Sequence, residues 1–477
     1  MDIAKSSLKL ALARSLSLVS RIAGVAYFAQ ELGASALGSL FLFQALLAVS
    51  AFPANFGFGI AVEKRISEGQ DKKQIVGTGI AIKSILVLVT VVSVFFFQTQ
   101  INNYVGAVVS TYLGLAIILN EARRLAVNIL QGQLRVGETA IFDLVYVFIW
   151  IGSGSFFVFL GYSVELLIIS IIFGKVGQLL IAVSKLSIQI GKPSTRQAKS
   201  LFNYAMYSII PEFDNQVYNW LDVLIIGLLL SQSLVGAYEI AWRVAGPVLL
   251  FTAAIGRSMF PQISQWAADG EMKKIEDSIP NIITPSIILV FPAFFGGLLL
   301  SKEILIIIFG NEFQVAWLAL IVLLASKIPF SFRMIAGKTL LGLDRADLVM
   351  KTAVTDILLN IILNGILIWR IGILGAAIGT SVAMTIGSVH RLHYLSMYVN
   401  IKIPYREVGW CIFSSIIMFV CLSFVTEWIE PTTISQLGLT VVSGAFIYSA
   451  LIALYPPLRI KAISRMQKWI SEVDFQL

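Results

Sequence analysis

Apolar stretches about as long as a bilayer is thick alternate with short polar stretches along the whole chain. Most of them approach the roughly 20 residues that an α-helix needs to cross the hydrocarbon core. The pattern therefore predicts an all-α polytopic membrane protein with about 14 transmembrane helices. The predicted helices are residues 8–30, 38–60, 74–97, 104–122, 139–160, 164–184, 202–230, 234–260, 280–300, 312–336, 352–369, 373–390, 407–427 and 433–455.

Composition supports a membrane protein. Of the 477 residues, 57% are hydrophobic and only 13% are charged, whereas about a quarter of the residues in a soluble protein are charged. The first twenty residues lack a signal-peptidase site followed by a polar domain, so we expect the first segment to be retained. Cys411 and Cys421 share one segment, about 15 Å apart along a helix, which is too far for a disulfide.

Loop charges orient the chain in the membrane. If the two tails and every second loop lie on one side, that side carries 25 of the loop Lys and Arg residues, and the other side carries only Lys302 and Arg370. Basic loops face the cytoplasm. We therefore expect a multi-pass protein of the plasma (inner) membrane with both termini cytoplasmic. The net charge of +8 then reflects cytoplasmic loops, not nucleic-acid binding.

An internal repeat indicates two halves. SALGSLFLFQALLAVSAFP resembles SLVGAYEIAWRVAGPVLLF, and the repeat places Gly38 and Gly236 in corresponding positions. Halves with an even number of helices have the same orientation and are related by an axis along the membrane normal. The predicted organisation is an N-lobe (1–186), a cytoplasmic linker (187–201), a C-lobe (202–400), two accessory helices (401–456) and a cytoplasmic amphipathic tail (457–477).

Ionisable and polar residues inside the predicted helices are the candidate functional groups, because such residues almost always face a bundle interior or a wet cavity. Several fall on single helix faces at spacings of three or four residues. The stripes comprise Arg14, Ser17 and Arg21; Asp214, Tyr218 and Asp222, with Asn215 and Asn219 beside them; and Thr352, Asp356, Asn360 and Asn364. Single charges are Lys83, Lys175, Lys327 and Arg333.

Glu239 and Arg243 are four residues apart on one segment, in the favourable order for an intrahelical pair. Either the two charges neutralise each other for stability, or Arg243 faces a cavity and binds an anion. By the helical rise, Arg21 and Asp214 lie at similar depth on the first helices of the two halves. A cleft between the halves would place their stripes opposite each other.

No cofactor or metal site is predicted. AGKT at 336–339 lacks the earlier glycine of a phosphate-binding loop, because that position is Phe332. His390 and His393 have no Cys or carboxylate near them in sequence and are interpreted as interfacial residues. The short outer loops leave no room for an external catalytic domain. We therefore expect a protein that is not an enzyme.

Several motifs, in order, resemble the polysaccharide-transport branch of the multidrug/oligosaccharidyl-lipid/polysaccharide (MOP) exporters. The family pattern of an Asp, an apolar run, Gly-x-Tyr and a later Phe-Pro is matched by Asp222, Gly236, Tyr238, Phe260 and Pro261. FGNEFQVAW and LNIILNGILIWRIGILGAAIGTSVA resemble its tenth to twelfth helices. The resemblance covers most of residues 8 to 400.

The resemblance implies two pseudo-symmetric six-helix lobes around a central cleft plus two accessory helices. It also implies export of a polyprenyl-(pyro)phosphate-linked oligosaccharide by alternating access, as in Wzx-type flippases, for cell-surface glycan synthesis such as O-antigen. Substrate-binding candidates are Arg14, Arg21, Asp214, Tyr218, Asn219, Asp222, Arg243 and Lys327. Ion-coupling candidates are Asp214, Asp222 and Asp356.

Two other functions stay open. A cation-coupled drug or small-molecule antiporter of the same superfamily would use the acidic residues and would not need Arg21 or Arg243. A membrane glycosyltransferase or polymerase is disfavoured by the short outer loops. For partners we expect the lipid-linked oligosaccharide, membrane lipids and the polymerase or glycosyltransferases of the same pathway. We expect a monomer that binds no nucleic acid.

Overall fold

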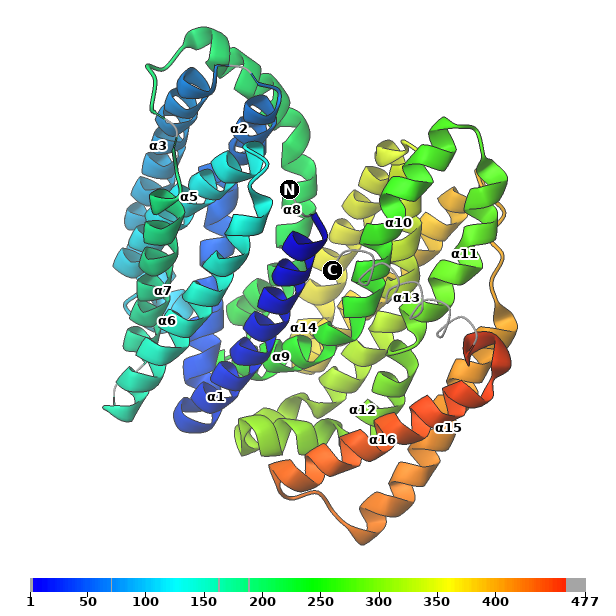
Figure 1. Ribbon diagram of the computed structural model, residues 1–477. Helices are drawn as coiled ribbons and strands as arrows, with labels where there is room; N and C mark the ends of the chain where they lie inside the picture. Colours follow the sequence, from blue (N-terminus) through cyan, green and yellow to red (C-terminus); the bar gives the residue numbers. More distant parts are fainter. Residues whose placement is uncertain (1–2, 70, 162–163, 188, 460–477) are drawn as a thin grey trace. The chain divides into compact units, whose positions relative to one another are not determined.

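The computed structural model describes residues 3–69, 71–161, 164–187 and 189–459. Within them, the side chains of residues 3–15, 140 and 207–218 are not described. The regular elements of these ranges are all helices (Figure 1). They form two compact units, Met1–Glu239 and Ile240–Leu477. The division falls within one helix, beyond the predicted linker, so the lobe boundary at 187–201 stays a prediction.

The helices follow the predicted segments closely. Unit 1 contains α1 (Ile3–Asn55), α2 (Phe58–Ser67), α3 (Lys72–Phe96), α4 (Gln98–Val105), α5 (Ser110–Gly132), η1 (Val136–Thr139), α6 (Ala140–Phe159), α7 (Val164–Ser184), α8 (Thr195–Leu229) and the first part of α9 (Gln232–Ala245). Unit 2 contains the rest of α9, η2 (Gly246–Leu249), α10 (Leu250–Ala268), α11 (Met272–Ile287), α12 (Val290–Ile304), η3 (Leu305–Phe309), η4 (Asn311–Ala316), α13 (Trp317–Gly342), α14 (Ala346–Ser396), α15 (Tyr405–Trp428) and α16 (Ile434–Leu454).

Two of these helices each cover two predicted segments. α1 is interrupted at Gly33, where φ is 76° and ψ is 178°, and α14 is interrupted at Ile371 and Gly372. In the described residues, 10 helices are long and apolar enough to cross a membrane, or 11 if the pair α4 and α5, bent by 98°, forms one span. The all-α polytopic class is confirmed. The number 14 stays a prediction.

In unit 1, the start of α9 packs directly on α1 through the two glycines of the sequence repeat. A Cβ atom at Gly38 would meet the backbone carbonyl of Gln232, and one at Gly236 would meet the carbonyl of Ala34. Small residues at such positions let two membrane helices approach to backbone contact. This approach explains why the first part of α9 belongs to unit 1.

In unit 2, α13 runs along α14, and the two accessory helices α15 and α16 pack on α12. The hydroxyl of Tyr448 on α16 donates to the carbonyl of Ile288 (2.8 Å), and the indole of Trp410 on α15 donates to the carbonyl of Leu451 (2.9 Å). Met418, Leu422 and Tyr448 form a small buried cluster between these helices. The accessory pair is therefore anchored by hydrogen bonds and by apolar burial.

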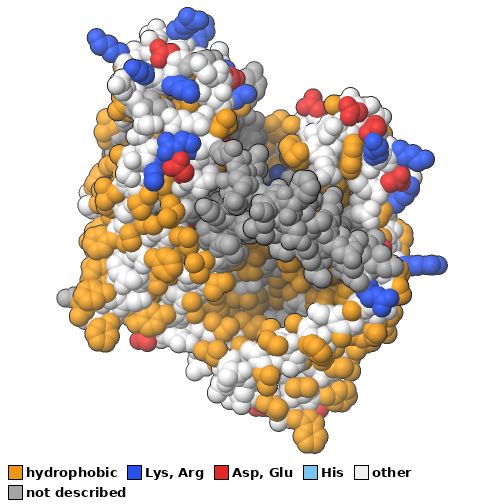
Figure 2. Space-filling model, viewed as in Figure 1, with side chains coloured by type: hydrophobic (Ala, Val, Ile, Leu, Met, Phe, Trp, Pro, Cys, Tyr) orange, Lys and Arg blue, Asp and Glu red, His pale blue; other side chains and the backbone are white. Residues whose placement is uncertain are grey.

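Charged side chains gather toward one end of each unit, and apolar side chains cover its flanks (Figure 2). The ion pairs at the helix ends include Arg65–Glu68, Arg135–Glu138 and Arg345–Asp347. All three lie in loops that the basic-residue pattern places in the cytoplasm. The hydrogen bond from Arg65 holds the pKa of Glu68 below its usual value.

Candidate functional site

Two cations of unit 1 share one aromatic ring. The guanidinium carbon of Arg21 on α1 lies 5.2 Å from the ring centre of Tyr146 on α6, and the ammonium of Lys175 on α7 lies 5.7 Å from it. Both distances fall within the reach of a cation–π interaction. Tyr146 stacks on Trp150 (6.1 Å between centroids, 17° between planes), and Gly174 leaves space for its ring. The ring is thus held in place between three helices.

The two cations lack a close counter-charge. The Lys175 ammonium donates to the side-chain oxygen of Asn120 (2.9 Å). Within the part of the chain that the structure describes, no carboxylate lies within ion-pairing distance of Lys175 or Arg21. Lys175 is buried, and an ammonium keeps its charge in such a place only with polar partners or an anion. The arrangement is suited to binding an anionic group.

A buried ion pair lies beside this cation pair. The ammonium of Lys83 on α3 lies 2.8 Å from Glu121 on α5, and both side chains are almost fully buried. Lys83 also donates to Asn55 at 3.0 Å. Glu121 in turn accepts from Asn120 at 3.0 Å. Since Asn120 also binds Lys175, polar contacts run without interruption from Asn55 to the Tyr146 ring.

Asp222, from the acidic stripe of α8, is bonded to the next helix. The hydroxyl of Tyr238 on α9 donates to the Asp222 carboxylate at 2.5 Å, and both residues are buried. These two residues were singled out in the sequence for the family resemblance. Their hydrogen bond explains how the Asp222 carboxylate is accommodated in an apolar segment.

Unit 2 also places a cation over an aromatic ring. The ammonium of Lys327 on α13 lies 4.0 Å from the ring centre of Trp242 on α9. Lys327 is 1% exposed. A desolvated cation–π contact of this kind is worth about 2 kcal/mol. Lys327, a predicted substrate-binding residue, is therefore positioned by the residue directly before Arg243.

The polar stripe on α14 joins helices within unit 2. Asp356 accepts two hydrogen bonds from the buried guanidinium of Arg333 on α13, at 2.9 and 2.6 Å. Thr352 accepts from Arg391 (2.9 Å), and Asn360 donates to Thr380 (2.8 Å). The carboxylate predicted to couple an ion thus forms a buried ion pair in this structure.

Five candidates from the sequence remain: Arg14, Asp214, Tyr218, Asn219 and Arg243. The side chains of Arg14, Asp214 and Tyr218 lie outside the described residues. Asn219 and Arg243 are half-buried, on α8 and α9. Arg21 and Arg243 belong to different units. The prediction that both face one cleft stays a prediction.

Sequence reasoning did not select Tyr146, Asn120 or Glu121. Lys83 and Lys175 were noted as single charges in apolar segments, and a buried charge needs a partner. That rule shows that a partner exists but does not say which of many carboxylates and amides supplies it. Contacts between helices far apart in sequence decide this.

Comparison with known proteins places the chain in a family. The model of a family described as "Polysaccharide biosynthesis protein" matches residues 29–318. The probable low-salt glycan biosynthesis flippase Agl15 of Haloferax volcanii is 43% identical over 98% of this chain and 99% of that protein. The chain belongs to this polysaccharide biosynthesis family. The probable flippase AglR of the same organism is 27% identical over 94% of each chain.

Solved structures show the fold of this family member. A lipid II flippase MurJ in an inward closed conformation matches with a TM-score of 0.77 at 15% identity, over 93% of this chain and 98% of that chain. An inward-facing multidrug resistance MATE family transporter of the MOP superfamily matches with a TM-score of 0.64 at 14% identity, over 82% and 97% of the two chains. These likenesses show the fold, and the predicted resemblance to a polysaccharide-transport family is confirmed by the family model and the 43% identical relative.

Proposed function

We propose that this chain is a flippase that moves a polyprenyl-(pyro)phosphate-linked oligosaccharide across the plasma membrane by alternating access, for the synthesis of a cell-surface glycan. The observation that carries the proposal is the 43% identity, over nearly the whole length of both chains, with a probable glycan biosynthesis flippase. The protein acts as a transporter, not as a catalyst. It works as a monomer with both termini in the cytoplasm, next to the enzymes that make and polymerise its substrate.

The cation pair of unit 1 supports a phosphate-bearing substrate. The guanidinium of Arg21 is a planar fork that can donate two parallel hydrogen bonds to one phosphate. Lys175 donates only one of its three hydrogen bonds to Asn120 in the described contacts. The Tyr146 ring holds both cations in place, and each cation has N–H groups that make no described hydrogen bond. We infer that the pyrophosphate contacts Arg21 and Lys175 during its passage.

The acidic residues fit the antiporter alternative less well. A carboxylate that carries a transported cation has to exchange its partner during the cycle. Asp356 is held by two hydrogen bonds from Arg333, and Asp222 by one from Tyr238. In the flippase proposal these two carboxylates have structural roles. If transport is coupled to an ion, Asp214 or the Lys83–Glu121 pair binds that ion.

The test is a flipping assay in proteoliposomes with a fluorescent polyprenyl-pyrophosphate oligosaccharide. Arg21→Lys and Lys175→Gln should reconstitute normally but lose most of the flipping rate, about tenfold or more, because a bidentate or charge-assisted bond to phosphate is lost. Arg243→Lys should lose a similar share of the flipping rate if this residue also contacts the substrate. Lys302→Gln, at an exposed lysine, is the matched control and should be fully active.

Two results would contradict the proposal in different ways. An unmodified protein that flips no lipid-linked oligosaccharide but exchanges drug cations for protons would exclude the function itself. Abundant and fully active Arg21→Lys and Lys175→Gln variants would leave the function in place and remove the cation pair from the substrate path.

A further inference from the structure

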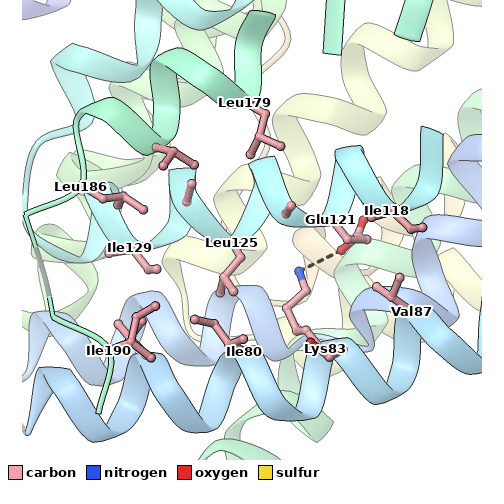
Figure 3. Close-up of a pocket in the computed structure, with 15 residues that line it drawn as sticks. Ile80, Lys83, Val87, Ile118, Glu121, Leu125, Ile129, Leu179, Leu186 and Ile190 are labelled. Atoms are coloured by element: carbon pink, nitrogen blue, oxygen red, sulfur yellow. Dashed lines mark ion pairs between the residues drawn. The ribbon is translucent and has the colours of Figure 1, made fainter. Parts of the chain in front are cut away.

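Unit 1 contains a cavity of about 550 Å³ that is separate from the cation pair at Tyr146. Its walls are α3, α5 and α7, and the chain segment that follows α7 lines one end (Figure 3). Its lining is apolar except for Lys83, Ser84 and Glu121. The volume lies within the usual range of small-molecule sites, roughly 300–1,000 Å³.

The two charges in the wall cancel each other. Figure 3 shows Lys83 and Glu121 pointing toward one another across the space between α3 and α5, at 2.8 Å. The Lys83 ammonium is further satisfied by Asn55. The cavity therefore offers an ion no unpaired charge. Along Ile80, Leu125 and Ile129 it offers only hydrocarbon, which suits an apolar chain.

The segment between α7 and α8 forms the end of the cavity because it is bonded to α3. The amide of Gly191 donates to the carbonyl of Lys73 (2.9 Å), and the amide of Ser194 donates to the hydroxyl of Thr78 (3.0 Å). Gly77 has no space for a side chain because the carbonyl of Gly191 lies against it. This contact holds Leu186 and Ile190 in the lining of the cavity.

This end of the cavity is basic. Lys72, Lys73, Lys185 and Lys192 are all exposed, and each lies within a few residues of a lining residue. Lys73 donates to the side chain of Gln189 at 2.6 Å, which leaves further donors for an anion. An apolar cavity with exposed lysines near one end matches one chemical class of ligand, a lipid with an anionic headgroup and a hydrocarbon chain.

We propose that this cavity binds one hydrocarbon chain of an anionic phospholipid of the surrounding membrane, with the headgroup at the lysines and the chain directed toward the Lys83–Glu121 pair. The protein's own tail is a poor occupant, because residues 461, 465 and 468 are basic and would be repelled by these lysines. The lipid would hold the segment between α7 and α8 against α3. That segment leads directly into α8, so the lipid acts as a structural ligand where the two predicted halves are joined.

The experiment measures lipid binding to the full-length protein purified in detergent. Dioleoyl phosphatidylglycerol is titrated against dioleoyl phosphatidylcholine, which has the same chains but no net charge. Binding is followed by native mass spectrometry and by the apparent melting temperature. A ligand that binds only the folded state raises that temperature as its concentration increases. We expect the anionic lipid to bind and stabilise and the zwitterionic lipid to do so much more weakly.

Substitutions locate the site. Ile80→Trp fills the cavity and should reduce the bound phosphatidylglycerol to the background level, whereas Val89→Trp, on an exposed position of the same helix, should not. Replacing exposed Lys73 and Lys192 by Gln should weaken phosphatidylglycerol binding about fivefold for each lysine without affecting folding. Each basic residue near an anionic lipid surface contributes a binding free energy that corresponds to about this factor.

Three outcomes would overturn the proposal. They are equal binding of the two lipids, unchanged phosphatidylglycerol binding by the Ile80→Trp variant, and unchanged binding by the lysine variants. If Ile80→Trp does not fold, the lysine variants and the comparison of the two lipids still decide. The readout contains no transport step, so a failed flipping assay leaves this result standing.

Discussion

The contact between α1 and α9 at Gly38 and Gly236 gives the sharpest stability prediction, and we consider the substitution Gly38→Ala. The added methyl group would lie only 2.5 Å from the carbonyl carbon of Gln232. Ordinary contacts of a Cβ atom begin at 3.4 Å. The carbonyl oxygen of Gln232 lies closer still, so in this close-packed interface the two helices must separate by more than the 0.9 Å by which the carbon contact falls short of 3.4 Å. The obstacle is backbone, so no side-chain rotation can relieve it.

The expected cost is at the upper end of that measured for overpacked sites, about 3 kcal/mol. Gly236→Ala should cost a similar amount, because its Cβ would meet the carbonyl of Ala34. The double variant should cost clearly less than the sum, since the first substitution already separates the same two helices. Gly152→Ala is the matched control. It lies on a helix of the same unit with no atom near its added methyl group.

The assay is the apparent melting temperature of the unmodified protein and its four variants in one detergent, together with their abundance in the membrane. Gly38→Ala and Gly236→Ala should melt well below the unmodified protein, and Gly152→Ala should not. A Gly38→Ala protein as stable as the control would refute the backbone contact. Fully additive effects of the two glycine substitutions would refute the claim that they share one interface.

Two further predictions concern buried ion pairs. Glu121→Gln should destabilise unit 1 by about 3–5 kcal/mol, because buried Lys83 loses the carboxylate at 2.8 Å. Lys83→Met should cost less, because Glu121 keeps an ion pair with Arg124 at 3.6 Å. A protein carrying both substitutions should recover much of the loss; melting temperatures of the full double-mutant cycle test this, and a loss in the double variant equal to the sum of the single losses would argue against the pair. Asp356→Asn should lower the melting temperature by a comparable amount because Arg333 loses its counter-charge. Gly387→Ala should act in the same direction, since its methyl group would displace that carboxylate; normal stability of both proteins would show that the pair is not essential.

The amino-acid sequence by itself determined the class of the protein. Apolar runs of bilayer length can satisfy their backbone polar groups in hydrocarbon only as helices or closed barrels, and runs near 20 residues select helices. The predicted segments accordingly fall on the observed helices. The resemblance of ordered motifs, including Asp222 and Tyr238, was sufficient to indicate the family. These inferences depend on the length and composition of each segment and on the order of motifs, all of which can be read directly from the sequence.

The sequence also identified several charged residues of the candidate site, but not their partners Tyr146, Asn120 and Glu121. It marked Arg21, Lys327 and Asp356 as costly residues in an apolar segment, because a charge in the membrane requires a compensating partner. It marked Gly38 and Gly236 as equivalent positions of a repeat. It assigned no partner to Lys83 or Lys175, and it treated the acidic residues as candidates for ion coupling.

Only the tertiary structure decided which residues meet. It brought Lys83 to Glu121, Arg333 to Asp356, and both Arg21 and Lys175 to Tyr146. It also placed the two repeat glycines in one contact between α1 and α9. The physical reason is that each helix exposes several polar groups around its circumference, and many pairings satisfy the same rule of charge compensation. The choice among them is made by how whole helices pack, through contacts between residues that are distant in sequence.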